Sequence, residues 1–247
     1  MATVRLDIEY DGGGFRGWAA QPGLRTVQGE LEGALETVLR ERVQLTVAGR
    51  TDTGVHALGQ VASFETEAEA EVPGDLARRL NGVGPDDVAV RAAAVVADGF
   101  DARRDAKSRS YRYRVLARRA PSPFEQGRAL WWPHRIDREA LDACANALIG
   151  THDFTAFTPT QTDHVRFERD VLAASWSDEG EIIAFRITAD AFMRNMVRVL
   201  VGTMLREASP RPQGRESFTT LLRGAARSEA GDTAPPHGLY LESVAYD

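Results

Sequence analysis

The order in which apolar patterns follow one another constrains the fold of this chain most strongly. Alternating apolar and polar residues predict a strand at 4–10, and patterns typical of helix, strand, strand, helix and strand follow in turn up to residue 96. From residue 111 the order β-α-β-β-α-β begins again and ends at 239–245. Each copy has the order of a ferredoxin-like unit. The sequence therefore predicts an α+β fold of two ferredoxin-like halves, at 1–105 and 106–247, that join their antiparallel sheets.

The individual elements follow from local pattern and cap residues. In the first half we expect strands at 4–10, 43–47, 60–64 and 88–96, with helices from Thr26 and at 75–81. In the second half we expect strands at 111–115, 171–176, 182–187 and 239–245, and helices from Asp137, from Met193 and near 218–222. Gly150 is predicted as the C-cap of the helix that Asp137 begins, and 151–170 as a long polar loop. The run Asp178-Glu179-Gly180 predicts a hairpin.

Composition excludes several classes of protein. The chain has 247 residues, 43% of them apolar, which is enough for a full core. No apolar run reaches the length of a membrane span, and the start lacks a signal-peptide pattern. The single cysteine, Cys144, excludes an internal disulfide and is expected as a buried thiol on a helix. The five histidines show no metal-ligand spacing, so we expect no metal site. These features predict a cytoplasmic protein without a membrane partner.

Charge distribution, more than net charge, indicates a polyanionic partner. The net charge of −6 does not suggest a nucleic-acid binder, but residues 101–119 hold eight Arg or Lys side chains against two aspartates. Arg109 and Arg112 belong to this basic segment, and we predict that they bind RNA phosphates. The alternative is a solvated charged face of a strand, which is equally compatible with charge alone.

A short polar connection between two predicted strands carries the candidate chemistry. The segment 49–56 holds two glycines, Arg50, Asp52 and His56. Glycine permits unusual backbone conformations and close approach, and a carboxylate held between two such points is a usable nucleophile. The cation at Arg50 favours the ionised form of a nearby carboxylate. The alternative is a polar loop in which Asp52 makes a local turn through its own side chain.

A glycine pattern near the start suggests a second, weaker hypothesis. Gly12, Gly14 and Gly17 satisfy G-x-G-x-x-G after a strand, which is typical of a dinucleotide site in an oxidoreductase. That mechanism requires a helix to start directly at the glycines, and the next helical pattern starts only near Thr26. We therefore expect no nucleotide cofactor.

Several motifs together resemble one enzyme family. The segment 48–57, AGRTDTGVHA, resembles the signature AGRTDAGVHA of the tRNA pseudouridine synthase A (TruA) family and departs from it only at Thr53. Similar resemblances lie at 9–18, around Tyr111, at 192–202 and at 234–241, so the likeness spans nearly the whole chain. Departures also occur at 81–85 and 166–169.

The resemblance implies a pseudouridine synthase fold with its active site between the halves. It implies a tRNA pseudouridine(38-40) synthase, an isomerase that needs no cofactor or metal and acts on uridines at positions 38, 39 and 40 of the anticodon stem-loop. The uridine is expected to flip out of the stack. The family works as a homodimer, with one tRNA touching both subunits. A rival interpretation is an RNA-binding module without chemistry, which would not need the carboxylate.

The resemblance also implies a role for individual residues. Asp52 corresponds to the catalytic aspartate, which attacks either C6 of the base or C1′ of the ribose. Arg50 corresponds to the arginine that helps flip the base, and Arg198 to the arginine that pairs with the aspartate. Tyr111 corresponds to the tyrosine that stacks on the uracil, and Leu239 would pack against it. Without the family, a core aromatic is the better interpretation of Tyr111, and a solvated cation that of Arg198. His56 is expected to order its loop by hydrogen bonds.

Overall fold

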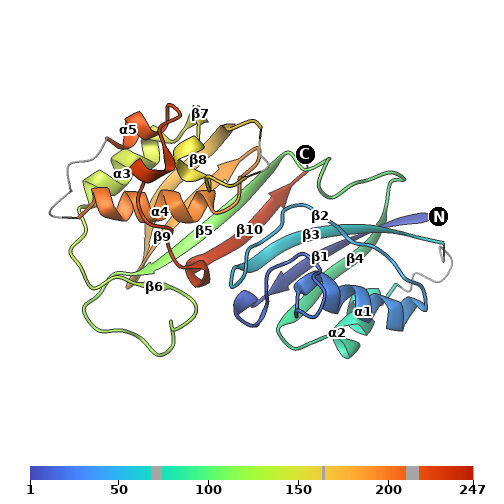
Figure 1. Cartoon of the computed structure of the whole chain (residues 1–247). Helices are drawn as coiled ribbons and strands as arrows, with labels where there is room; N and C mark the ends of the chain where they lie inside the picture. The colour runs from blue at the N-terminus through green and yellow to red at the C-terminus, as the bar shows by residue number, and fades with distance from the viewer. Residues whose placement is uncertain (68–73, 163–164, 210–216, 247) are drawn as a thin grey trace. The chain divides into compact units, whose positions relative to one another are not determined.

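The computed structural model describes residues 1–67, 74–162, 165–209 and 217–246. The chain forms two compact units, Met1–Lys107 with Tyr240–Asp247, and Ser108–Leu239. Each unit combines a mainly antiparallel sheet with helices, so the predicted α+β class is confirmed (Figure 1).

The first unit contains the predicted order β-α-β-β-α-β. Its strands are β1 (Ala2–Tyr10), β2 (Thr46–Val47), β3 (His56–Thr66), β4 (Val88–Val96) and, from Tyr240, β10 (Leu239–Ala245). Its helices are η1 (Gly12–Gly14), α1 (Val27–Leu39) and α2 (Leu76–Val83). The strands lie in the order β4-β1-β3-β10, β2 pairs with β3, and only β10 runs parallel to its neighbour β3.

Strand alternation decides how the first unit is packed. Val4, Leu6 and Ile8 share one face of β1 and are fully buried. Helices α1 and α2 cover one face of this sheet (Figure 1). The opposite face carries a smaller cluster around Val61, against which Tyr246 packs. Both faces of this sheet therefore bury apolar side chains.

In this unit, polar side chains determine where helix α1 begins and how short strand β2 is. Thr26 is the N-cap of α1, as predicted, and its hydroxyl accepts a hydrogen bond from the amide of Gly29. The predicted strand at 43–47 is wrong in length, because only Thr46–Val47 pairs. The amide of Leu45 donates instead to the Glu32 carboxylate on α1, at 2.9 Å, and so is not available to the ladder.

The second unit has the sheet order β5-β9-β8-β7, with all these pairs antiparallel and β6 parallel to β5. Its strands are β5 (Ser108–Leu116), β6 (Leu130–Trp131), β7 (Gly150–Asp153), β8 (Glu168–Glu179) and β9 (Ile182–Ala189). Its helices are α3 (Arg138–Ala147), α4 (Met196–Glu207), α5 (Phe218–Leu221), η3 (Thr155–Phe157), η4 (Arg227–Glu229) and η5 (Pro236–Gly238). The predicted β8–β9 hairpin is confirmed, with Gly180 at φ +70° in its turn.

Aromatic rows and helices α3 and α4 form the core of the second unit. Tyr113, Phe185 and Trp176 are paired across β5, β9 and β8, so they share one face of the sheet. The rings of Trp176 and Phe185 lie 5.2 Å apart. Helices α3 and α4 cover one face of this sheet (Figure 1), and Met196 and Leu200 of α4 are fully buried.

Two predictions in the second unit are wrong. Helix α3 has its C-cap at Leu148, so Gly150 is not a cap and begins β7, with φ +106°. The segment 151–170 is not one loop, since it contains β7, η3 and the start of β8. The reason is that β7 pairs with β8 through four polar or small residues, a pairing that leaves no apolar alternation in the sequence.

The compact units differ from the predicted halves in extent. The first unit ends after Lys107, and residues 240–247 group with it although the prediction placed them in the second half. Pairing explains the grouping, because Tyr240 and Leu241 of β10 lie opposite His56 and Ala57 of β3.

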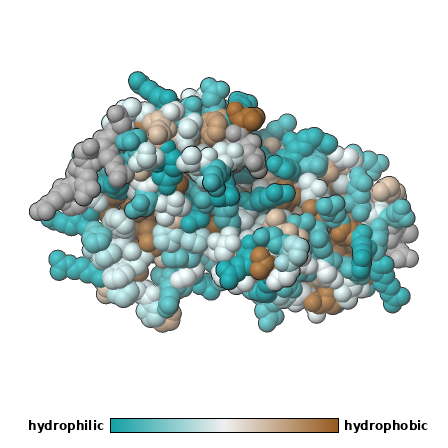
Figure 2. All heavy atoms as spheres, in the orientation of Figure 1, coloured by the Kyte–Doolittle hydropathy of each residue, from teal (hydrophilic) through white to brown (hydrophobic). Residues whose placement is uncertain are grey.

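The surface offers neither a membrane span nor a continuous apolar area on the face that is drawn. Among the helices in the four described ranges, none is long and apolar enough to cross a membrane. Figure 2 shows hydrophobic residues on that face as separate patches surrounded by hydrophilic ones.

Two glycines inside helices make a matched test of this packing. A Cβ on Gly202 in α4 would lie 1.9 Å from the carbonyl oxygen of Asp232, whereas a Cβ on Gly33 in α1 would meet nothing within 4 Å. We expect Gly202→Ala to lower the free energy of unfolding by about 1–3 kcal/mol through overpacking. Gly33→Ala should raise it by about 0.5–1 kcal/mol. Urea unfolding measures both, and equal shifts of the same sign would contradict the packing described here.

Candidate active site

The segment 49–55 forms a tight turn that carries Asp52. The carbonyl oxygen of Asp52 accepts a hydrogen bond from the amide of Val55 at 3.1 Å, so residues 52–55 are a β-turn. Its third residue, Gly54, has φ +77°, which is typical of a type II turn. Thr53 is exposed at the second position, where the turn accepts most residues. The turn thus tolerates threonine at the one place where the segment departs from the TruA signature.

Buried side-chain hydrogen bonds hold the two ends of this segment. The hydroxyl groups of Tyr10 and Thr51 are 2.8 Å apart. The amide of Gln60 donates to the carbonyl oxygen of Gly49 at 2.8 Å and to the Tyr10 hydroxyl at 3.3 Å. Tyr10, Thr51 and Gln60 are all buried. Because buried polar groups are costly when unpaired, this network favours one conformation of the segment.

The glycine-rich segment near the start supports the turn from the other side. The amide of Trp18 donates to the carbonyl oxygen of Thr51 at 3.0 Å. A Cβ on Gly12 would lie only 1.9 Å from the carbonyl oxygen of Val55, and Gly17 has φ +94° against the same turn. These glycines therefore allow two backbone segments to touch. Helix α1 starts only at Val27, so the geometry does not support the dinucleotide alternative.

His56 links the turn to β3 and β10. It is the first residue of β3, and its side chain is 3% exposed. Its Nδ1 accepts a hydrogen bond from the amide of Gly12 at 3.1 Å, and its ring stacks on Tyr240 with centroids 4.6 Å apart. The predicted role of His56 in ordering the loop is therefore confirmed.

The two candidate residues of the turn differ in exposure. Asp52 is half-buried, whereas Arg50 is exposed. The structure thus carries a half-buried carboxylate and an exposed cation two residues apart on one supported segment.

In the second unit, Tyr111 and Arg109 lie on the same face of β5, two residues apart. Tyr111 is 8% exposed, and its ring meets Phe192 edge-on with centroids 4.9 Å apart. Arg109 donates from Nη1 to the carbonyl oxygen of Asp190 at 2.9 Å.

Arg198 and Leu239 are joined through the segment that precedes β10. Arg198, in the first turn of α4, donates from Nε to the carbonyl oxygen of Ala234 at 2.7 Å and from Nη1 to Asn195 at 2.9 Å. The hydroxyl of Tyr113 donates to the carbonyl oxygen of Pro235 at 2.8 Å. These bonds hold the backbone at Ala234 and Pro235, in the segment that leads to the buried Leu239. Burial raises the pKa of Tyr113 well above its usual range, so this phenol stays a donor.

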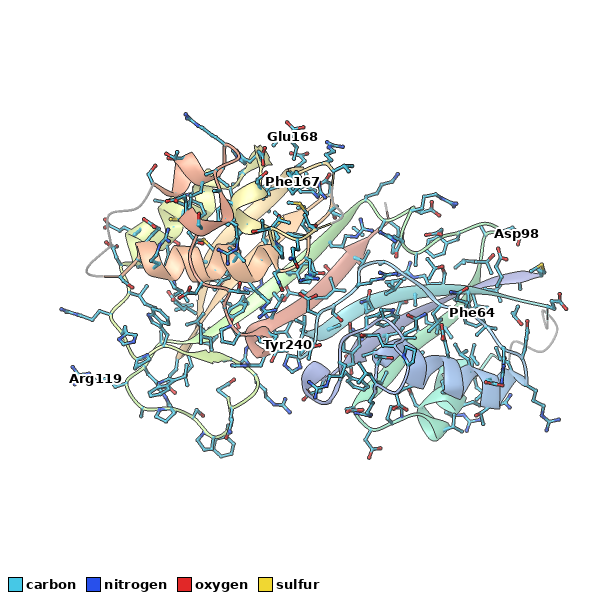
Figure 3. All side chains as sticks on the ribbon, viewed as in Figure 1. Phe64, Asp98, Arg119, Phe167, Glu168 and Tyr240 are labelled. Atoms are coloured by element: carbon cyan, nitrogen blue, oxygen red, sulfur yellow. The ribbon has the colours of Figure 1, made fainter. Side chains whose placement is uncertain are left out.

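The structure does not bring Arg112 to Tyr111. Strand alternation places Arg112 and Arg114 on the opposite face of β5. Arg112 lies 3.7 Å from the Glu179 carboxylate, and Arg114 makes a bidentate pair with Glu125 at 2.8 and 3.0 Å. Farther along the basic segment, Arg119 is exposed (Figure 3).

No metal or thiol chemistry accompanies these residues in the part of the chain that the structure describes. Within those ranges no group of three or more His, Cys, Asp or Glu side chains could hold a metal ion. Cys144 is buried, as expected, and burial raises the pKa of its thiol to about 12, which makes it a poor nucleophile.

Comparison with known proteins decides the family. The chain matches the family described as tRNA pseudouridine synthase over residues 8–103 and 144–247. It belongs to the tRNA pseudouridine synthase family. A relative from Bacillus licheniformis named tRNA pseudouridine synthase A is 40% identical, and the alignment covers 99% of each chain. Relatives with the same name from Frankia casuarinae and Acetivibrio thermocellus are 44% and 38% identical, covering 100% of this chain and 90% and 100% of theirs.

Membership of the tRNA pseudouridine synthase family confirms the fold class and the enzyme class that the motifs predicted.

Sequence reasoning missed two residues that support the turn, Tyr10 and Gln60. Both lie on strands beside buried apolar residues, where a polar side chain needs a buried partner. That pattern signals burial but cannot name the partner.

The buried phenol of Tyr10 makes the network testable by pH. Burial raises its pKa to about 12, although hydrogen bonds from Thr51 and Gln60 act in the opposite direction. An unfolded tyrosine ionises near about pH 10. The stabilising contribution of the neutral phenol is therefore fully present below about pH 10 and is lost as pH rises towards about 12.

We expect the wild-type protein to lose about 2 kcal/mol more stability than Tyr10→Phe between about pH 10 and 12. Urea unfolding at a series of pH values measures the difference, and the interval from pH 7 to 9 is the internal control, where the difference should stay constant. Parallel curves for the two proteins up to pH 12 would show that Tyr10 is not buried as described.

Proposed function

We propose that this enzyme isomerises uridine to pseudouridine at positions 38, 39 and 40 of the tRNA anticodon stem-loop, with Asp52 as the nucleophile on a flipped-out uridine. Family membership and the TruA-like signature support the reaction class. The observation that carries the role of Asp52 is its place at the head of a turn that buried hydrogen bonds hold on both sides.

The reaction makes specific demands on the protein. The bond from C1′ to N1 breaks, a bond from C1′ to C5 forms, the proton on C5 leaves and N1 gains a proton, so no oxidant is consumed. The site must supply a nucleophile, hold the detached base and exclude competing water. Asp52 would attack C6 or C1′. A carboxylate on a preformed turn meets the first demand without rearrangement.

The other residues supply binding and orientation in this proposal. Arg50, exposed beside Asp52, enters the space that the flipped base leaves. Tyr111 and Leu239 contact the uracil, and Arg198 completes the catalytic set. Arg109 and Arg112 bind RNA phosphates. Arg112 lies on the face of β5 opposite to Tyr111 and pairs there with Glu179. The phosphate that Arg112 binds would therefore belong to another part of the tRNA than the target uridine.

We further propose that the enzyme acts in the cytoplasm as a homodimer, without a cofactor. The support is the resemblance to the TruA family. Light scattering with and without tRNA measures the mass of the assembly.

Pseudouridine mapping tests the proposed reaction and the nucleophile together. Unmodified tRNA transcript with uridines at 38–40 is incubated with the protein, and pseudouridine is located by carbodiimide labelling and primer extension. We expect stops at those positions with the wild-type protein. Asp52→Asn should lower the single-turnover rate at least about 10⁴-fold, because covalent catalysis is lost, while tRNA affinity changes little.

Asp86→Asn is the matched control, since Asp86 is an exposed aspartate of the same unit that follows the C-terminal end of helix α2. It should retain the wild-type rate. Tight tRNA binding without any stops would favour the RNA-binding module, and normal turnover by Asp52→Asn would remove Asp52 from the mechanism.

A further inference from the structure

An arginine near the start of β8 is buried without a full set of partners. Arg169 is 9% exposed and follows Phe167 and Glu168, which Figure 3 labels on the second unit. Its Nη1 donates to the carbonyl oxygens of Arg166 and Glu168, at 2.9 and 2.7 Å. Its Nε is buried and finds no hydrogen-bond acceptor among the residues that the structure describes. The charges that act on its guanidinium are those of Asp190 and Arg166.

The geometry of guanidinium shows what this arginine lacks. Nε–H and one N–H of Nη2 point the same way along one edge of the planar group, and that edge matches two oxygens of a phosphate or carboxylate. In Arg169 the backbone carbonyls occupy only Nη1. Since a buried charged donor without an acceptor is destabilising, the edge formed by Nε and Nη2 calls for an anion.

The charges around Arg169 agree with an anion site. Arg166 is exposed nearby, and burial, with a contribution from the positive charge of Arg166, lowers the pKa of Arg169. The opposing negative charge is that of Asp190, and its Oδ1 accepts hydrogen bonds from the amides of Asp170 and Ala191. Oδ1 of Asp190 therefore serves the backbone at this point, and Asp190 acts on Arg169 through its charge.

Strand register connects this arginine to the proposed base-stacking residue. Val171 of β8, two residues after Arg169, and Arg109 of β5 both lie opposite Ala189 of β9. Arg109 also donates to the carbonyl oxygen of Asp190. Two residues after Asp190 is Phe192, whose ring touches Tyr111. The segment 189–192 thus runs from the two arginines to Tyr111.

We propose that the Nε–Nη2 edge of Arg169 binds a backbone phosphate of the RNA, next to the nucleotide that stacks on Tyr111. Arg109 is the second cation of this subsite. The proposal rests on the proposed function for the identity of the RNA. A purely structural role, in which Arg169 only holds the carbonyls at 166 and 168, is the alternative.

A scan of single phosphates separates these two roles. An anticodon-arm RNA is prepared with one neutral methylphosphonate at each position around the target uridine, and the Kd of each RNA is measured by fluorescence anisotropy. The wild-type protein should bind about tenfold more weakly when one particular phosphate is neutral. Arg169→Gln should bind the unmodified RNA about tenfold more weakly and show no further loss at that position.

Two further variants complete the experiment. Arg166→Gln removes an exposed arginine three residues away and should keep the wild-type response to the critical phosphate. Arg169→Lys keeps a charge and a donor for the carbonyls. Neutralising the critical phosphate should weaken RNA binding by this variant at least about threefold less than binding by the wild-type protein, since an ammonium group lacks the planar edge. If both Arg169 variants respond like the wild type at every phosphate, Arg169 has only a structural role.

The binding scan also separates this proposal from the proposed function. Pseudouridine formation together with a phosphate response that does not depend on Arg169 would overturn the phosphate site alone. A response that depends on Arg169, without pseudouridine formation, would support the site and overturn the proposed isomerase. Failure of the wild-type protein to bind the RNA would overturn both.

Discussion

The candidate site depends on a buried network of hydrogen bonds beneath the turn. It joins the side chains of Tyr10, Thr51 and Gln60 to one another and to the carbonyl oxygen of Gly49. A turn between two strands needs partners for its backbone groups, because unpaired buried groups are costly. Here side chains from β1 and β3 supply them from within the core of the first unit. The turn that carries Asp52 is therefore attached to the same strands that form the sheet.

The glycine-rich segment near the start of the chain packs against this attached turn. Gly12 and Gly17 lie against the turn, where a side chain would collide with the carbonyl oxygens of Val55 or Thr51. His56 adds a side-chain acceptor for the amide of Gly12 and a stacked contact with β10. A site that is held in this way on rigid elements is preorganised, so little reorganisation is needed when substrate binds. The pattern that resembles a nucleotide-binding fingerprint is, in this chain, a support for the turn that carries Asp52.

Much of this arrangement follows from local sequence rules. Alternation predicted β1, β4 and β5, and the cap residues Thr26 and Asp137 fixed the starts of α1 and α3. Alternation also implies that Arg112 faces away from Arg109 and Tyr111, although charge counting grouped Arg112 with Arg109. The motif predicted the turn around Asp52, because its glycines permit the backbone conformation that a tight turn needs, as Gly54 shows with φ +77°.

The remaining features depend on partners that are distant in the sequence. The shortening of β2 follows from a contact between Leu45 and Glu32 on α1, and β7 exists because β8 pairs with it. The burial of Arg169 likewise depends on the pairing of β7, β8 and β9, since nothing in its own segment distinguishes it from the exposed Arg166. Local patterns cannot encode such pairings, which only the assembled sheet determines.

The most direct test of the preformed turn is amide hydrogen exchange in the protein without RNA, followed by NMR at Gly12, Trp18 and Val55. Their amides donate to His56, Thr51 and Asp52 in the structure. We expect slow exchange at all three in the wild-type protein and at least about tenfold faster exchange in Gln60→Ala, with the amides of β1 and β4 unchanged. Fast exchange at these three amides in the wild-type protein would contradict the claim that the core holds the turn of Asp52 in place before RNA binds.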